Sequence, residues 1–135
     1  MHNATYRLMS ILCATLVLGF ATQVAMAQDA VKVDPQHYTV EFENAQVRVV
    51  RIKYGPHEKS VMHGHPASVA VFLTDGQAKF TLPNGKTEER NWKAGQTLWA
   101  DAGKHLPENV SDKPLEVILV ELKAKPTKTT SAKTK

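Results

Sequence analysis

The middle of the chain is a series of short runs rich in β-branched and aromatic residues, separated by glycine, proline, asparagine and aspartate. Such runs predict strands joined by tight turns. The predicted strands are Tyr38 to Phe42, Val47 to Tyr54, Val69 to Leu73, Ala78 to Leu82, Thr87 to Trp92, Thr97 to Ala100 and Glu116 to Leu122. No stretch among them has a convincing helical period, and short strands at close spacing favour a sandwich or a barrel. The sequence therefore predicts an all-β domain.

The strongest turn signal is Pro83-Asn84-Gly85-Lys86, where the Asn-Gly pair can supply the two positive φ values of a tight hairpin. The runs on either side of it, Ala78 to Leu82 and Thr87 to Trp92, should therefore pair antiparallel. The run from Glu116 to Leu122 is almost continuously apolar, which favours a strand covered on both faces or close to it.

The first 27 residues have the organisation of a secretory signal peptide. A short polar stretch ending at Arg7 precedes an apolar run, Leu8 to Ala21, and Ala25-Met26-Ala27 is a small-x-small cleavage pattern. We expect cleavage after Ala27, a mature chain that begins at Gln28, and a periplasmic or secreted protein. An uncleaved anchor is the alternative, but the run is shorter than the roughly 20 residues of a membrane span, so we expect no stable membrane insertion.

The cysteine content and the distribution of charge limit the chemistry and the binding partners that this protein could have. The one cysteine, Cys13, lies in the signal segment, so the mature chain would have no disulfide, thiolate ligand or cysteine nucleophile. The formal net charge of +4 comes largely from the C-terminus, where five lysines lie: Lys123, Lys125, Lys128, Lys133 and Lys135. The rest of the mature chain has a slight excess of acids, which argues against nucleic acid as a partner. Residues 124–135 predict a disordered Lys/Thr-rich tail, either simply solvated or loosely attracted to anionic lipid or cell-wall polymer.

His63-Gly64-His65 is the pattern that carries chemistry. In a strand, side chains alternate between faces, so these two histidines would share one face with Cα atoms roughly 6.5 Å apart. Two imidazoles at that spacing can bind one ion, and His105, further along the chain, can supply a third. Three protein ligands leave positions open for water or a small molecule. The pattern predicts one divalent metal ion, which could be iron, zinc, nickel, copper or manganese.

Two segments around these histidines resemble the signature motifs of the cupin superfamily. The first reads GPHEKSVMHGHPASVAVFLTDG and matches the pattern Gly, spacer, His-x-His, three or four residues, Glu, six residues, Gly, with a longer first spacer. The second reads GQTLWADAGKHLPEN and matches at Gly95, Gly103, His105 and Asn109, although Asp101 replaces a proline and the Gly-to-His spacing is one residue short. The first motif places the glutamate of the family at Val69.

The resemblance implies a single cupin-type jelly-roll barrel, a double-stranded β-helix, over residues 28–123. It also implies that the metal ligands are His63, His65 and His105. Val69 cannot bind a metal, so the three-His-one-Glu set of the family would be reduced to three histidines, as in some oxygenases of the superfamily. The alternative is that the histidines line a small barrel that binds no metal.

Several neighbouring residues have open roles. His57 and Glu58 could add a fourth ligand if the long spacer folds back, or lie in an exposed loop. Glu108 could orient His105 or be a surface residue. Three aromatic residues could form an apolar substrate cage or simply the core: Phe72, Phe80 and Trp99.

The function expected from this reading is a periplasmic or secreted metal-binding cupin. It could be a three-His metal-dependent enzyme, dioxygenase-like or an isomerase or lyase, acting on a small molecule. The alternatives are a non-enzymatic small-ligand or metal-binding module and a metal-free structural barrel. Because small barrels have exposed strand edges, we also expect a homodimer.

Overall fold

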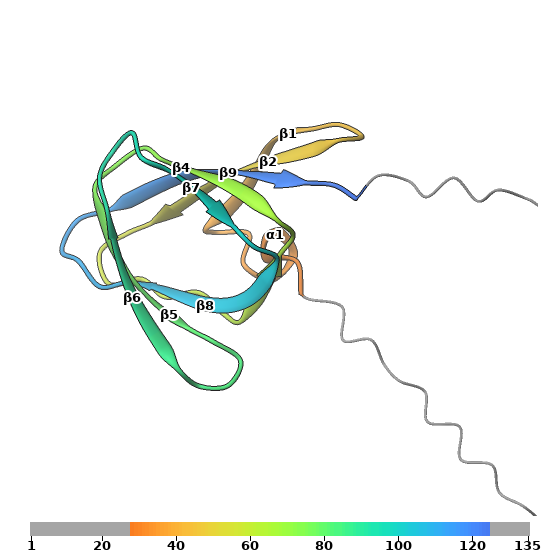
Figure 1. The fold of residues 1–135 in the computed structure, drawn as a ribbon. Coiled ribbons are helices and arrows are strands. Elements are labelled where there is room, and N and C mark those ends of the chain that lie inside the picture. Colours follow the sequence, from red (N-terminus) through yellow and green to blue (C-terminus); the bar gives the residue numbers. More distant parts are fainter. Residues whose placement is uncertain (1–27, 125–135) are drawn as a thin grey trace, which may run out of the picture.

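The computed structural model describes residues 28–124 of the chain. A short helix is followed by nine strands, and Figure 1 shows them wrapped around one interior. The elements are α1 (Ala30–Val33), β1 (Tyr38–Glu43), β2 (Val47–Tyr54), β3 (His63–His65), β4 (Ser68–Phe72), β5 (Gly76–Thr81), β6 (Thr87–Trp92), β7 (Thr97–Ala100), β8 (Gly103–Asn109) and β9 (Leu115–Leu122). The predicted all-β class is confirmed.

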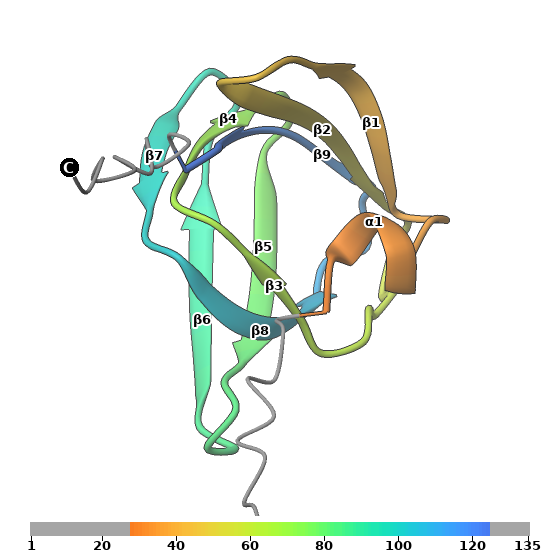
Figure 2. The same cartoon turned by 90° about the vertical axis from the view of Figure 1, so that its right-hand side faces the viewer.

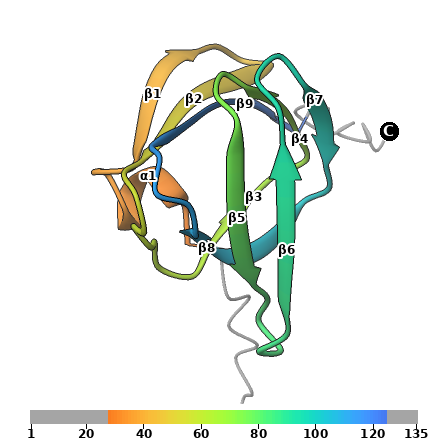
Figure 3. The same cartoon turned by 90° about the vertical axis from the view of Figure 1, so that its left-hand side faces the viewer.

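The strands form two sheets that face each other. The larger has five strands in the order β1-β2-β9-β4-β7, and the smaller has four in the order β3-β8-β5-β6. Figures 2 and 3 show the two sheets enclosing the interior from opposite sides, with α1 at one end. This is the jelly-roll barrel that the sequence predicted. No helix in the described part of the chain is long and apolar enough to cross a membrane.

Every predicted strand is present, and the structure adds three elements. Strand β3 contains the His-x-His pattern, and β8 carries His105. The helix α1 was not predicted, because a four-residue helix is too short to show a period. Its start is nonetheless capped, since Asp29 Oδ1 accepts a hydrogen bond of 3.1 Å from Val31 N.

The predicted hairpin between β5 and β6 forms, with Thr81 opposite Thr87, but its turn differs from the expected one. Gly85 has a φ of 81°, whereas Asn84 is not among the residues with positive φ. Instead, Asn84 Oδ1 accepts a hydrogen bond of 3.0 Å from Lys86 N. The asparagine therefore stabilises the turn through its side chain, and only the glycine needs a left-handed backbone.

The core lies between the sheets and contains aromatic and aliphatic side chains from both. Phe72 and Trp92 stack with ring centroids 4.6 Å apart, and a Cβ atom at Gly76 would lie 2.4 Å from the indole ring of Trp92. Glycine is thus required there by close approach. Strand β9 buries alternate residues (Leu115, Val117, Leu119 and Glu121), while the residues between them are less buried. The second face of this strand is therefore partly covered, in line with a strand that is close to buried on both faces.

Candidate metal centre

Strands β3 and β8 bring the three predicted histidines together. They pair antiparallel with His63 directly opposite His105, and His65 lies on the same face of β3 as His63. The three pairs of ring centroids are 4.9, 5.1 and 5.5 Å apart. One potential ligand atom from each ring lies within 4.8 Å of the other two. In the described part of the chain, these are the residues that could hold a metal ion.

Hydrogen bonds fix which nitrogen atoms face the cluster. His63 Nδ1 lies 2.8 Å from Val61 O and therefore donates to it, and His65 Nδ1 lies 2.7 Å from Glu121 Oε1. In a neutral imidazole that donates from Nδ1, Nε2 is the nitrogen that can bind a metal, and in both rings Nδ1 is the one turned to these partners. His63 Nε2 is buried and has no hydrogen-bond partner in the described structure. A buried acceptor without a partner is costly, and a metal ion would satisfy it.

The electrostatics also suit metal ligation. Burial, followed by the proximity of His65, lowers the pKa of His63 to about 4. Burial and the two other histidines lower the pKa of His105 to about 3. Both imidazoles are therefore neutral at pH 7, the state in which imidazole binds a metal.

A hydrogen bond from Glu121, which is itself paired with Arg48, supports His65 from outside the cluster. Glu121, which is 1% exposed, accepts from His65 and also from Arg48 Nε at 2.5 Å. Burial would raise the pKa of Glu121, but the hydrogen bonds from His65 and Arg48 outweigh it and lower the pKa. Arg48 in turn donates to both oxygens of Asp29, at 2.7 and 3.0 Å. Sequence reasoning missed Glu121, although a lone acid at an inward position of an apolar strand was a usable signal.

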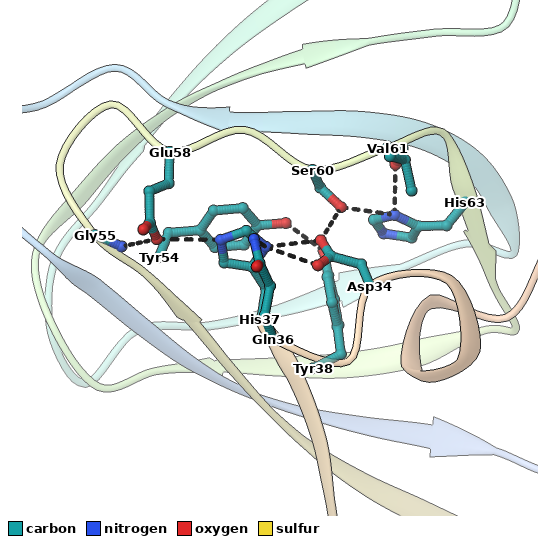
Figure 4. A network of polar contacts seen from close by, with 10 residues as sticks. All are labelled: Asp34, Gln36, His37, Tyr38, Tyr54, Gly55, Glu58, Ser60, Val61 and His63. Atoms are coloured by element: carbon teal, nitrogen blue, oxygen red, sulfur yellow. Dashed lines mark hydrogen bonds and ion pairs between the residues drawn. The ribbon is translucent and has the colours of Figure 1, made fainter.

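A second polar network lies on the other side of His63 (Figure 4). Ser60 Oγ is 3.4 Å from His63 Nδ1 and donates to Asp34 Oδ2. Asp34 binds His37 Nδ1 at 2.8 Å, and His37 Nε2 lies 3.1 Å from Glu58 Oε2. The network therefore runs from the buried His63 to the half-exposed Glu58 and holds the long spacer before β3 in place.

Two tyrosines lie beside both the network and the cluster. Their hydroxyl oxygens are 2.7 Å apart, the ring of Tyr54 stacks on His37, and the edge of Tyr38 meets the ring of His63. Burial raises the pKa of Tyr54 to about 12 and that of Tyr38 well above 10. Both hydroxyls therefore stay protonated and can donate a hydrogen bond.

A cavity of about 850 Å³ between the sheets is bordered by His65 and His105 but not by the buried His63. Phe72 and Phe80 line it, as expected for an apolar cage, and the ring of Phe80 lies 5.1 Å from that of His105. Trp99 belongs to the strand that borders the cavity, but it pairs with Val69, is 53% exposed and donates to Asp101 at 2.9 Å. Trp99 is among the residues that border the cavity, but the register places its side chain on the same face as Val69, away from Phe72.

The comparisons with known proteins agree with this architecture. A cupin domain from Bordetella pertussis Tohama I is 26% identical, with a TM-score of 0.60, and the match covers 64% of this chain and 92% of that one. The chain has the cupin fold. An RmlC-like cupin family protein with a double-stranded β-helix fold from Methanocaldococcus jannaschii is 22% identical, with a TM-score of 0.51 over 66% of this chain and 83% of that one.

A third cupin-like structure is an uncharacterized conserved protein with a double-stranded β-helix domain from Klebsiella pneumoniae subsp. pneumoniae. It is 23% identical, with a TM-score of 0.50 over 65% of this chain and 84% of that one. These similarities show the cupin fold that the two motifs indicated. No protein-family model and no curated protein matches the sequence.

The structure corrects the position of the cupin glutamate. Strand β4 buries Ser68, Ala70 and Phe72 towards the cavity, whereas Val69 lies between them on the outer face. A spacer of four residues after the second histidine, which the cupin motif also allows, falls on Ala70. The residue that takes the place of the glutamate inside this barrel is therefore Ala70. The conclusion that the carboxylate is missing stands.

The other candidate residues lie away from the three histidines. His57 is exposed and lies 2.7 Å from Asp112, and Glu58 accepts from Gly55 N at 2.5 Å, so both belong to the exposed loop. Glu108 pairs with Lys79 at 3.0 Å. Of the two roles open to Glu108, its pairing with Lys79 favours a surface residue over a partner of His105. The carboxylate that orients a histidine of the cluster is Glu121, which acts on His65.

Proposed function

We propose that this protein is an exported metal-dependent cupin that binds one divalent ion through His63, His65 and His105 and acts on a small molecule in the adjoining cavity. The observation that carries the proposal is the convergence of three imidazoles, two of which border a largely apolar cavity, with the buried Nε2 of His63 left without a partner. A buried polar atom without a hydrogen-bond partner is expected where a bound ligand supplies that partner.

The donor set favours some ions over others. Three imidazoles suit zinc, copper, nickel and iron, whereas manganese prefers oxygen ligands, and Ala70 offers none. When bound, such an ion supplies Lewis acidity or, for iron and copper, redox chemistry. Three protein ligands leave room for the small molecule beside the ion.

The residues of this chain would position the ion and the small molecule. Glu121 holds the ring of His65, and Val61 O holds the ring of His63. Phe72 and Phe80 give the cavity apolar walls, and Tyr54, whose hydroxyl is hydrogen-bonded to that of Tyr38, borders it as well. These features fit a dioxygenase-like reaction on an apolar molecule that carries oxygen atoms.

A non-enzymatic metal- or ligand-binding module is the second candidate. Among the described residues that line the cavity, the acids are Glu88, Asp101 and Glu108. Glu88 and Asp101 are exposed, and Glu108 is paired with Lys79. The absence of a free buried carboxylate from this lining weakens isomerase or lyase chemistry that needs a general base.

The test is the metal content of the full chain expressed in an exporting host and purified without a His tag. Elemental analysis should find about one divalent ion per chain, and His63→Ala and His105→Ala should each lose it. His57→Ala is the matched control, because His57 is an exposed histidine outside the cluster. Full metal content in His105→Ala would refute the site. Oxygen consumption with small-molecule panels then distinguishes an enzyme from a binding module.

A further inference from the structure

Two buried side-chain polar atoms have no hydrogen-bond partner in the described part of the chain, and the metal centre accounts for only one of them. The first is His63 Nε2, and the second is the indole Nε1 of Trp92. Trp92 is 9% exposed and lines the same cavity as His65 and His105. Because a buried N–H without an acceptor is costly, the indole indicates that a bound molecule supplies the acceptor.

The other buried polar side chains that line the cavity are satisfied within the protein. The hydroxyl groups of Tyr38 and Tyr54 bond to each other, and the Ser68 hydroxyl donates to a backbone carbonyl at 2.6 Å. The amide of Asn109 donates to two backbone carbonyls and accepts from a serine hydroxyl. Among the described lining residues outside the histidine cluster, Trp92 is therefore the buried one with a hydrogen bond still to offer.

Packing on two sides holds the indole of Trp92 in place. Its ring stacks on that of Phe72, with the centroids 4.6 Å apart. Opposite Trp92 in the pairing of β5 with β6 is Gly76, where a Cβ atom would lie only 2.6 Å from Nε1. The lack of a side chain at Gly76 thus makes room for the edge of the ring that carries the nitrogen. A donor held in this way selects its acceptor by position.

The indole lies far from the metal centre along the barrel. Phe80, whose ring is 5.1 Å from that of His105, and Gly76, which is opposite Trp92, lie four residues apart on the same face of β5. Four residues of a strand span about 14 Å. A molecule that reaches from the histidines to Trp92 is therefore elongated. On its way it would meet apolar lining residues: Phe72, Ala78, Val117 and Leu119.

The surroundings of Trp92 favour a neutral acceptor over an anion. A buried anion needs a cation beside it, and the cation of β6 is Arg90. The guanidinium carbon of Arg90 lies 5.6 Å from the centroid of the Phe80 ring, and the group pairs with Glu88 at 2.9 Å. Arg90 is thus directed to Phe80 and Glu88. A carbonyl, ether or hydroxyl oxygen can accept from the indole without such a partner, whereas a carboxylate cannot.

We propose that Trp92 Nε1 is a recognition donor for the molecule that the cavity binds, and that this molecule is an elongated apolar compound with a neutral oxygen at the end remote from the histidines. The inference rests on the proposed function only for what binds at the histidine end, because the contact with Trp92 involves no metal. The far end of the cavity then determines specificity. A compound that lacks the oxygen leaves the indole N–H unpaired and binds more weakly.

Two probe compounds of equal shape test the contact, and neither needs a metal. The compound para-acetylbiphenyl carries a ketone oxygen where para-isopropenylbiphenyl carries a methylene group. The full chain labelled with ¹⁵N-tryptophan has two tryptophans and gives two indole N–H signals. Trp99→Phe assigns them, because Trp99 is exposed and only the signal of Trp92 then remains. The ketone should move the proton signal of Trp92 downfield, as hydrogen bonding does, and the alkene should not.

Calorimetric titration gives a second readout. Wild type should bind the ketone about 5-fold more tightly than the alkene, which is the effect of one neutral hydrogen bond. Trp92→Phe should bind both equally, whereas Trp99→Phe, the matched control, should keep the preference.

Three results would overturn the proposal, even if Trp92→Phe does not fold. They are a ketone that does not bind, equal affinities of wild type for ketone and alkene, and a Trp92 signal that the ketone does not move. Tighter binding of the carboxylate para-phenylbenzoate would reject a neutral acceptor. Elemental analysis of the same samples tests the metal centre separately, because a metal-free wild type that prefers the ketone would refute the proposed function alone.

Discussion

Replacing Glu121 by glutamine tests whether the carboxylate behind His65 serves the metal centre. The change keeps the size of the side chain but removes the charge that lies 2.7 Å from His65 Nδ1 and 2.5 Å from Arg48 Nε. An amide oxygen accepts a weaker hydrogen bond than a carboxylate, so His65 becomes a poorer ligand. Loss of such a partner weakens metal affinity about 10- to 100-fold. Because glutamine still accepts, we expect about 10-fold, or about 1.4 kcal/mol.

The same substitution has a separate effect on the fold. Arg48 keeps its two hydrogen bonds to Asp29, so the folded protein loses one charged hydrogen bond, which contributes about 1.5–3 kcal/mol to the free energy of unfolding. Zinc affinity is measured by competition with a fluorescent chelator at pH 7.5, and stability by urea unfolding of the metal-free protein.

Glu116→Gln is the matched control, because Glu116 lies on the same strand but pairs with Arg51 on the outer face. It should leave zinc affinity unchanged. If Glu121→Gln loses stability yet binds zinc as tightly as wild type, Glu121 supports the fold only, and our account of the metal centre is wrong. An equal loss of affinity in Glu116→Gln would indicate a general charge effect instead.

Three further predictions follow from the same geometry. Ala70→Glu should raise Mn²⁺ or Fe²⁺ affinity, whereas Val69→Glu on the outer face should not; equal affinities in a metal titration would reject Ala70 as the position of the cupin glutamate. Without metal, Ala70→Glu should lose several kcal/mol of stability, because it buries an unpaired carboxylate. The pKa of His63 falls from 6.5 when unfolded to about 4 when folded, so below pH 6.5 the unfolded chain binds more protons. His63 alone should therefore lower the free energy of unfolding of the metal-free protein by about 2–3 kcal/mol between pH 7 and pH 4. His105, whose pKa burial lowers to about 3, should add a further fall in the same direction; a flat urea-unfolding profile would contradict this. Deleting Pro126 to Lys135 should leave the melting temperature unchanged, because that segment consists of Pro, Thr, Lys, Ser and Ala and has no large apolar side chain to bury. A drop of several degrees would show that it packs on the barrel.

The strands were predictable because their signal is local. Alternation and turn residues lie within each run, so β5, β6 and the hairpin between them follow from adjacent letters of the sequence. The placement of His63 and His65 on one face of the same strand is a local signal for the same reason. His105 needed a different source, the resemblance to the second cupin motif, because nothing in its own neighbourhood indicates which strand lies opposite.

The missed features depend on contacts between distant segments. Glu121 meets His65 because β9 packs beside β4 in the register Ser68 opposite Glu121, and one strand's sequence does not reveal that register. The network from Asp34 to Glu58 likewise joins the segment before β1 to the loop before β3. The assignment of the cupin glutamate to Val69 failed because the motif allows a spacer of either three or four residues. The spacer alone therefore does not tell whether Val69 or Ala70 points into the barrel, and the burial pattern of β4 shows that it is Ala70.

The distribution of the candidate ligands along the chain determines when a metal could be acquired. His63 and His65 lie on β3, His105 lies on β8, and the supporting Glu121 lies on the last strand. A chain that has not yet completed β9 lacks the group that orients His65, so a tight site would exist only after folding is complete. If the protein crosses a membrane unfolded, the ion must come from the compartment in which the chain folds. The metal bound in the cell would then reflect supply outside the cytoplasm rather than the intrinsic preference of the three imidazoles.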